Sequence, residues 1–273
     1  MKFVYATAPL QEADFVLIGV PDESQNTSPR TGSKRGPELI RKIAYERCVF
    51  KRKGRFTSEA VPPKISQKIH DYGDVEKKKL GKVIEVLKGK VPLILGGDQG
   101  VTLEAIKQFP QATIVYFDAH PHILPSLQGY YGSVLTTAEL SLGKCVQIGV
   151  RETEVEELKH VKKEMILRIS AEELFEKGNA SSWEQIRKKV QGEVYISLDL
   201  NVFDPAFAPG VSAPVPGGLD YYQVLFLLKK MLQEYTVVAV DIIELTPSYD
   251  QDYRTAHLAT KLLLDIIQNY KKK

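Results

Sequence analysis

Short apolar runs alternate with amphipathic stretches along most of the chain. The apolar runs are rich in β-branched residues and mostly lack a polar face, which predicts strands buried between helical layers. The predicted strands cover residues 14–20, 91–95, 113–117, 145–150, 165–169, 194–200 and 236–243. The predicted helices cover residues 37–46, 74–89, 101–108, 153–163, 182–190, 220–234 and 255–269. This alternation predicts a doubly wound parallel sheet in a three-layer α/β/α fold, and the lack of a Gly-, Ser- or Pro-rich linker predicts a single domain over 1–273.

Composition narrows the class of protein. The chain is 43% hydrophobic and 26% charged, which is typical of a soluble globular protein. A formal net charge of +3 without a basic stripe, and the lack of a run of ~18 apolar residues, argue against nucleic-acid and membrane partners. Cys48 and Cys145 are isolated, and the N-terminus does not resemble a signal peptide, so we expect a cytoplasmic protein.

Polar residues that suit a metal ion follow one of these strands directly. Asp118, His120 and His122 lie just beyond 113–117, at the strand end where such sheets place their ligands. Residues i, i+2 and i+4 of an extended chain face the same way, and Asp and His supply the oxygen and nitrogen donors that Zn²⁺ and Mn²⁺ accept. A hydrogen-bonded loop in which Pro121 stops the strand explains the same residues, so the motif alone leaves both alternatives open.

Three other predicted strands also end in polar residues. Asp199 and Asn201 repeat the i, i+2 spacing, either as turn formers or as a second wall of the same site. The segment GGDQG lacks the Lys and Ser/Thr of a phosphate-binding loop, so we interpret it as a tight turn that places Asp98 or Gln99 at the sheet edge. Glu244 is either an exposed loop carboxylate or an anion that binds a cationic substrate. The convergence of four strand ends predicts a functional site there.

Taken together, these segments resemble the ureohydrolase superfamily of arginase, agmatinase and their relatives. The resemblance runs over nearly the whole chain, from the G-x-P segment and GP-x-x-IR helix start in 18–41 to "DIIELTPSYD" at 241–250. Between them, GGDQG stands for the family's GGDHS, DAHPH for its DAHxD, and 197–219 is similar to SxDxDxxDPxxAPGxGxPxxGGL. The resemblance implies an arginase-like fold, hydrolysis of linear C–N bonds, bound divalent metal and a homo-oligomer, usually a trimer or hexamer.

The chain departs from the family at the metal ligands themselves. The six positions that bridge two Mn²⁺ ions in the family hold Gln99, Asp118, His120, His122, Asp199 and Asn201 here. Gln99, His122 and Asn201 differ from the family pattern. A family histidine that shuttles protons, in an HG pair, falls on Tyr131-Gly132, so Tyr131 is a candidate catalytic residue by this correspondence.

Charge argues for one metal ion rather than two. The remaining carboxylates, Asp118 and Asp199, balance one dication, whereas a second would leave a buried excess of positive charge. Gln99 and Asn201 offer only neutral amide oxygens. We therefore expect one Zn²⁺ or Mn²⁺ on Asp118, His120 and Asp199, a set that resembles the single-zinc site of deacetylases with this fold and leaves an open position. His122 is then a further ligand or the catalytic base.

The first functional hypothesis is a metal-dependent C–N hydrolase. Water acidified by the ion would attack a guanidine, amidine or amide carbon, while Glu244 pairs with the substrate cation. Ile123, Leu124 and Pro125 are apolar where arginase-like members bind an amino-acid head group, which favours an agmatine-like amine over arginine. Two alternatives stay open: an inactive binding or scaffold protein that has lost its metals, and a deacetylase-like amidohydrolase with a single zinc.

Overall fold

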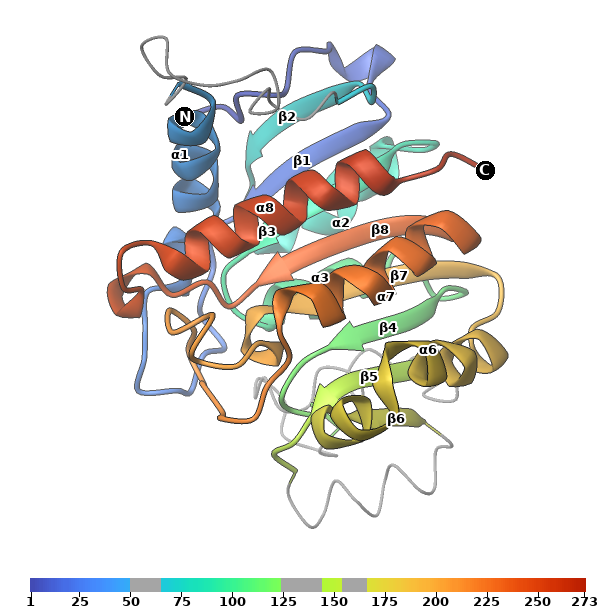
Figure 1. The fold of residues 1–273 in the computed structure, drawn as a ribbon. Coiled ribbons are helices and arrows are strands. Elements are labelled where there is room, and N and C mark those ends of the chain that lie inside the picture. Colours follow the sequence, from blue (N-terminus) through green and yellow to red (C-terminus); the bar gives the residue numbers. More distant parts are fainter. Residues whose placement is uncertain (50–64, 124–143, 154–165) are drawn as a thin grey trace, which may run out of the picture.

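A parallel sheet forms the centre of the protein in this computed structural model, which describes residues 1–49, 65–123, 144–153 and 166–273. Its strands are β1 (Phe15–Val20), β2 (Ile69–Asp74), β3 (Val91–Gly96), β4 (Thr113–Phe117), β5 (Cys145–Val150), β6 (Leu167–Ser170), β7 (Glu193–Asp199) and β8 (Thr236–Ile243). Their order across the sheet is β2-β1-β3-β8-β7-β4-β5-β6, and every pairing is parallel. The carboxyl ends of the strands therefore meet at one edge of the sheet (Figure 1).

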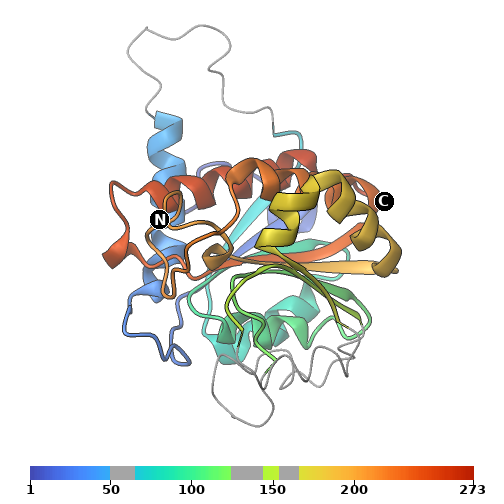
Figure 2. The same cartoon turned by 60° about the horizontal axis from the view of Figure 1, so that its bottom comes forward.

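Helices cover both faces of this sheet. They are α1 (Gly36–Val49), α2 (Leu80–Val86), α3 (Gly100–Ile106), α6 (Ala171–Lys189), α7 (Tyr221–Glu234) and α8 (Arg254–Asn269). Helices α1, α6, α7 and α8 pack on one face, and α2 and α3 pack on the other (Figures 1 and 2). The β1 side chains show the alternation, because Phe15 and Leu17 point into the first apolar layer and Val16 and Ile18 into the second. The predicted three-layer α/β/α sheet is confirmed.

The structure differs from the predicted elements around β2. Residue 74 was expected to begin a helix, but Ile69–Asp74 forms an edge strand and the α-helix begins only at Leu80. The strand has a half-exposed, polar sequence, IHDYGD, that lacks the apolar run of a buried strand. Its one buried carboxylate, Asp71, binds the guanidinium of Arg41 through both oxygens at 3.0 Å, which offsets the cost of burying either charge.

Helix α6 is longer than its apolar pattern predicts. It begins at Ala171 instead of 182, because the Ser170 side chain caps it by accepting the Glu173 N–H at 3.0 Å. The non-helical backbone of Gly178 interrupts it, which hides its helical periodicity in the sequence. The predicted helix over 153–163 lies almost entirely outside the described residues. None of the helices in the described part of the chain is long and apolar enough to cross a bilayer.

Candidate metal centre

Four neighbouring strands bring the sequence-predicted site residues together. β3, β8, β7 and β4 are adjacent in the sheet, and their carboxyl ends are followed or closed by Gln99, Glu244, Asp199 and Asp118. All four side chains are buried. The topology thus forms one polar cluster from residues that lie up to 145 positions apart in the chain, the separation of Gln99 and Glu244.

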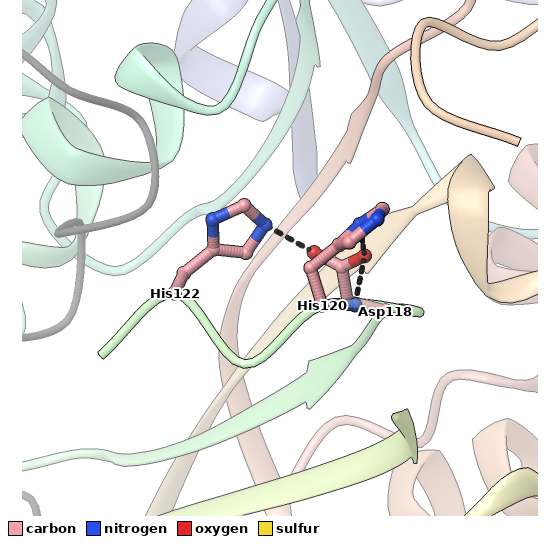
Figure 3. A group of neighbouring side chains, drawn as sticks. All are labelled: Asp118, His120 and His122. Atoms are coloured by element: carbon pink, nitrogen blue, oxygen red, sulfur yellow. Dashed lines mark hydrogen bonds and ion pairs between the residues drawn. The ribbon is translucent and has the colours of Figure 1, made fainter. Parts of the chain in front are cut away.

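Asp118, His120 and His122 form the centre of this cluster (Figure 3). One ligand atom from each lies within 4.8 Å of the others, and this is the one such His/Cys/Asp/Glu group in the described residues. Asp118 Oδ1 accepts the His120 backbone N–H at 3.0 Å and lies 3.3 Å from His120 Nδ1. Asp118 Oδ2 lies 2.8 Å from His122 Nε2. The two imidazoles therefore address different oxygens of one carboxylate.

His122 reaches Asp118 because the backbone turns sharply after Pro121. Its φ of 50° lies in the left-handed region, which a non-glycine residue rarely adopts. The turn is held from β5, where the Gln147 side-chain amide donates to the Pro121 carbonyl at 2.6 Å. Arg168 Nε in turn donates to Gln147 Oε1 at 3.0 Å. The ring of Tyr116 packs edge-on against the His122 ring, so β4 also helps to position the imidazole.

Asp199 forms the second wall of the cluster. Its Oδ1 accepts the Asn201 N–H at 2.6 Å, while its Oδ2 is buried without a hydrogen-bond partner in the described residues. Asn201 Oδ1 accepts the Ala213 N–H at 3.1 Å. Asp199 and Asn201 are thus turn formers, and their second predicted role, as a wall of the site, is compatible with this and stays a prediction.

The carboxyl groups of Asp118 and Asp199 influence each other's ionisation. Burial, followed by repulsion from Asp118 and Glu244, raises the pKa of Asp199 well above its usual range. Burial also raises the pKa of Asp118, but the neighbouring His122 and His120 outweigh it and leave that pKa below its usual range. A cation near these carboxyl groups would favour the ionised form of Asp199.

Glu244 is buried, which excludes one of the two alternatives from sequence, an exposed loop carboxylate. Its Oε1 accepts the Gln99 backbone N–H at 3.0 Å, and its Oε2 accepts a hydrogen bond from the Ser212 hydroxyl. Burial raises the pKa of Glu244 to about 8. Asp98, the other polar residue of the GGDQG turn, accepts the Gln25 and Gly100 N–H groups and so has a structural role.

The donors present at this edge fit a divalent metal ion. Asp199 Oδ2 and Gln99 Oε1 are buried oxygens with no hydrogen-bond partner among the described residues, and the buried Asp118 Oδ2 pairs with His122 Nε2. Buried polar atoms are almost always satisfied, and an unsatisfied one costs ~1–3 kcal/mol or more when charged. Carboxylate and amide oxygens together with imidazole nitrogen form a ligand set that Mn²⁺ and Zn²⁺ accept. A cation held at this edge would compensate the charge of the buried carboxylates.

The site differs from the sequence-based prediction in its coverage and in its positioning residues. Tyr131, the candidate catalytic residue, falls outside the described residues. The positioning residues Tyr116 and Gln147 were missed. Tyr116 precedes Asp118 by two residues and so shares its face of β4, a spacing that identifies it once the strand is placed. Gln147 gives no such signal, because its partner Pro121 is 26 residues away.

A parallel sheet between two helical layers, with carboxylate and imidazole side chains clustered at its carboxyl edge, defines an α/β/α protein with a candidate metal centre. Within that class the chain belongs to the arginase family, which it matches over residues 13–268. This confirms the resemblance to the ureohydrolase superfamily and the arginase-like fold.

Individual relatives are similar over nearly their full length. An uncharacterized 32.2 kDa protein of Methanothermus fervidus is 31% identical, with 98% of each chain covered. Agmatinase of Neisseria meningitidis is 30% identical over 93% of this chain and 86% of the relative. The crystal structure of agmatine ureohydrolase of Thermoplasma volcanium superposes with a TM-score of 0.83 at 28% identity, covering 98% of this chain and 93% of that one.

Proposed function

We propose that the protein is a hydrolase that cleaves a linear C–N bond in a small cationic guanidine, with agmatine as the first candidate, and that it uses one divalent metal ion. The observation that carries the proposal is the group of Asp118, His120 and His122, whose ligand atoms lie within 4.8 Å of one another, together with the buried Oδ2 of Asp199. The agmatinase of N. meningitidis and the agmatine ureohydrolase of T. volcanium support the choice of substrate.

The hydrogen bonds favour a particular position for the ion. Asp118 Oδ1, Asp199 Oδ1 and Asn201 Oδ1 each accept a backbone N–H. The oxygens without such bonds are Asp118 Oδ2, Asp199 Oδ2 and Gln99 Oε1, and His122 Nε2 lies beside the first. We therefore place the single ion on the Gln99–His122 side of Asp118, and not on the His120 side as the sequence predicted.

The residues around this position have separable roles. A divalent ion supplies Lewis acidity, which lowers the pKa of water toward neutrality. Asp118 and Asp199 balance its charge, and His122 is oriented toward it by the turn at Pro121. Glu244, with a pKa of about 8, is mainly protonated at neutral pH, and a guanidinium beside it would favour the carboxylate. The planar fork of a guanidinium then matches the two carboxylate oxygens.

The test is metal content together with turnover. Protein loaded with Mn²⁺ or Zn²⁺ and then dialysed is analysed by inductively coupled plasma mass spectrometry, and urea release from agmatine is followed in the same preparation. We expect one ion per chain, with both ion and activity lost in Asp118→Asn and Asp199→Asn. Asp74→Asn is the matched control, because Asp74 also ends a strand but pairs with Arg41.

Other outcomes separate the alternatives. A protein that takes up no ion, and whose melting temperature ignores added Mn²⁺ and Zn²⁺, contradicts the proposal and favours a binding or scaffold role. One ion per chain with acetate release from acetylated amines, and no urea from guanidines, identifies a deacetylase-like amidohydrolase instead.

A further inference from the structure

The main chain of Arg151, directly after β5, is bonded to the segment that carries Asp118 and His120. The backbone N–H groups of Arg151 and Glu152 both donate to the Ala119 carbonyl, at 3.0 and 3.1 Å. Asp118 N–H in turn donates to the Ile148 carbonyl at 3.0 Å. The turn that begins the metal-ligand segment is therefore fixed to the end of β5.

The side chain of Arg151 is bonded to the opposite wall of the site. Its guanidinium donates to backbone carbonyls of Gly149 (3.1 Å), Asn201 (2.9 Å), Val202 (3.1 Å), Phe203 (3.2 Å), Val215 (2.6 and 3.1 Å) and Pro216 (3.2 Å). Three of these acceptors are the consecutive residues 201–203, which begin two positions after Asp199. In the described part of the chain no carboxylate lies within ion-pair distance of this guanidinium. The guanidinium, a group that usually pairs with carboxylates, therefore bonds to backbone carbonyls, all of them in the 201–216 loop except that of Gly149 in β5.

The loop is closely fitted around this side chain. A Cβ on Gly218 would lie 2.4 Å from Asp204 N, 2.5 Å from the Phe203 carbonyl carbon and 2.7 Å from Arg151 Nη2, so only glycine lets the two parts of the loop approach this closely. Asp204 fastens the same closure, because its Oδ2 accepts the N–H groups of Gly217 and Gly218 at 2.7 and 3.1 Å. The guanidinium thus fills the space between the 201–203 and 215–218 parts of the loop.

We propose that Arg151 is a positioning residue that sets the separation of the Asp118 and Asp199 carboxylates and thereby the affinity of the site for its metal ion. Arg151 is bonded to both ligand segments, by its main chain to one and by its side chain to the other. A planar guanidinium presents five N–H donors in a fixed geometry, whereas a lysine ammonium is a single point that reaches few of these carbonyls. The consequence for metal affinity rests on the proposed function, but the positioning itself does not.

Two measurements on Arg151→Lys test this inference, with Arg254→Lys as the matched control because Arg254 donates to a single carbonyl, Ala206, on the outside of the same loop. In metal-free protein, hydrogen exchange by mass spectrometry should show at least tenfold faster exchange in peptides covering 118–121 and 199–203. Calorimetric titration with Mn²⁺ should show affinity weakened by ~10–100-fold, the usual effect of losing a group that orients metal ligands. Arg254→Lys should change neither. Arg151→Met provides a second variant with no donor.

The outcomes distinguish this inference from the proposed function. Arg151→Lys could lower the melting temperature while its exchange rates in both peptides and its Mn²⁺ affinity equal those of Arg254→Lys. In that case Arg151 is only a stabilising residue and the inference is overturned. If the wild-type protein takes up no Mn²⁺ or Zn²⁺, the proposed function fails, and hydrogen exchange alone decides whether Arg151 positions the two segments.

Discussion

Asp118 uses its two carboxylate oxygens for different purposes, and Asp199 does the same. In each, one oxygen accepts a backbone N–H two residues further along the chain, from His120 or Asn201. The other oxygen is buried, and it pairs with His122 in Asp118 and has no hydrogen-bond partner among the described residues in Asp199. A carboxylate restrained in this way holds its second oxygen in a fixed direction, which suits the proposed binding of a cation.

Restoring the family residues at the altered positions should restore a second ion. The triple variant Q99H/H122D/N201D gains two carboxylates, which would balance a second dication, and it replaces the lost imidazole of His122 with one at position 99. We expect metal content to rise from one Mn²⁺ per chain to two, measured by mass spectrometry after dialysis. Q99H alone adds no negative charge and should keep one ion. A triple variant that still holds one ion contradicts the charge argument.

The thiol of Cys145 should resist alkylation in the folded protein. It is fully buried in β5, and burial raises its pKa to about 12, so almost no thiolate exists at pH 8. In the C48S variant we expect iodoacetamide to label Cys145 at least a hundredfold more slowly in buffer than in urea, followed by mass spectrometry. Equal rates in both solutions would contradict this burial.

For individual residues, the sequence predicted which side chains come together at the site but not which of their atoms are in contact. The spacing of Asp118, His120 and His122 was sufficient to group them, because a strand end places alternate residues on one side. The side of Asp118 that remains free depends on N–H groups whose positions follow from the turns. The left-handed backbone of His122, held by Gln147 from another strand, is a tertiary effect that the local sequence does not encode.

Among the elements, α7 is the one whose start the sequence defines best. Asp220 accepts the Gln223 N–H at 2.8 Å, and the Gln223 side chain accepts the Asp220 N–H at 2.9 Å, a reciprocal capping box. Asp220→Ala should therefore lower the free energy of unfolding by ~1 kcal/mol. Asp220→Asn keeps an acceptor and should lose only a few tenths of that amount. Urea denaturation measures both, and equal losses would argue against the cap.

The contrast between α7 and β2 explains how far the elements are predictable. The α7 sequence contains both its cap and an apolar face, so its local signals agree. β2 is a polar edge strand stabilised by the Arg41–Asp71 ion pair, whose partners are 30 residues apart. An element stabilised by such a distant partner leaves no periodic pattern of its own, and sequence reasoning misses it.

For the whole molecule, a buried carboxyl group links the central strands. Asp241 in β8 accepts hydrogen bonds from the hydroxyls of Tyr195 and Ser197 in β7, at 2.6 and 2.8 Å. Burial raises its pKa from 3.8 to about 6, although these bonds act in the opposite direction. Between those values the folded protein binds this proton and the unfolded chain does not. Asp241 therefore lowers stability as the pH rises from about 4 to about 6.

The Asp241→Asn variant should lack this pH dependence. Carboxyl groups with lowered pKa, such as Asp71, act in the opposite direction, so the difference between variant and wild type isolates Asp241. From pH 4 to pH 7, we expect the free energy of unfolding of the variant to rise relative to that of the wild type by up to about 3 kcal/mol. Urea titrations in EDTA at several pH values measure it. A difference that stays constant with pH would falsify the assignment.

The position of β8 has a consequence for how the protein is made. This strand is the last in the chain, yet it lies between β3 and β7 in the middle of the sheet (Figure 1). During synthesis the N-terminal strands leave the ribosome first, as two groups with an open edge on β3 and another on β7. Only when Thr236–Ile243 emerges do the groups join, and Glu244 reaches Gln99 at the same moment. We therefore expect the candidate site to stay incomplete in a nascent chain until its last strand is inserted. A chain truncated before residue 236 should expose the unpaired edges of β3 and β7, which favour aggregation.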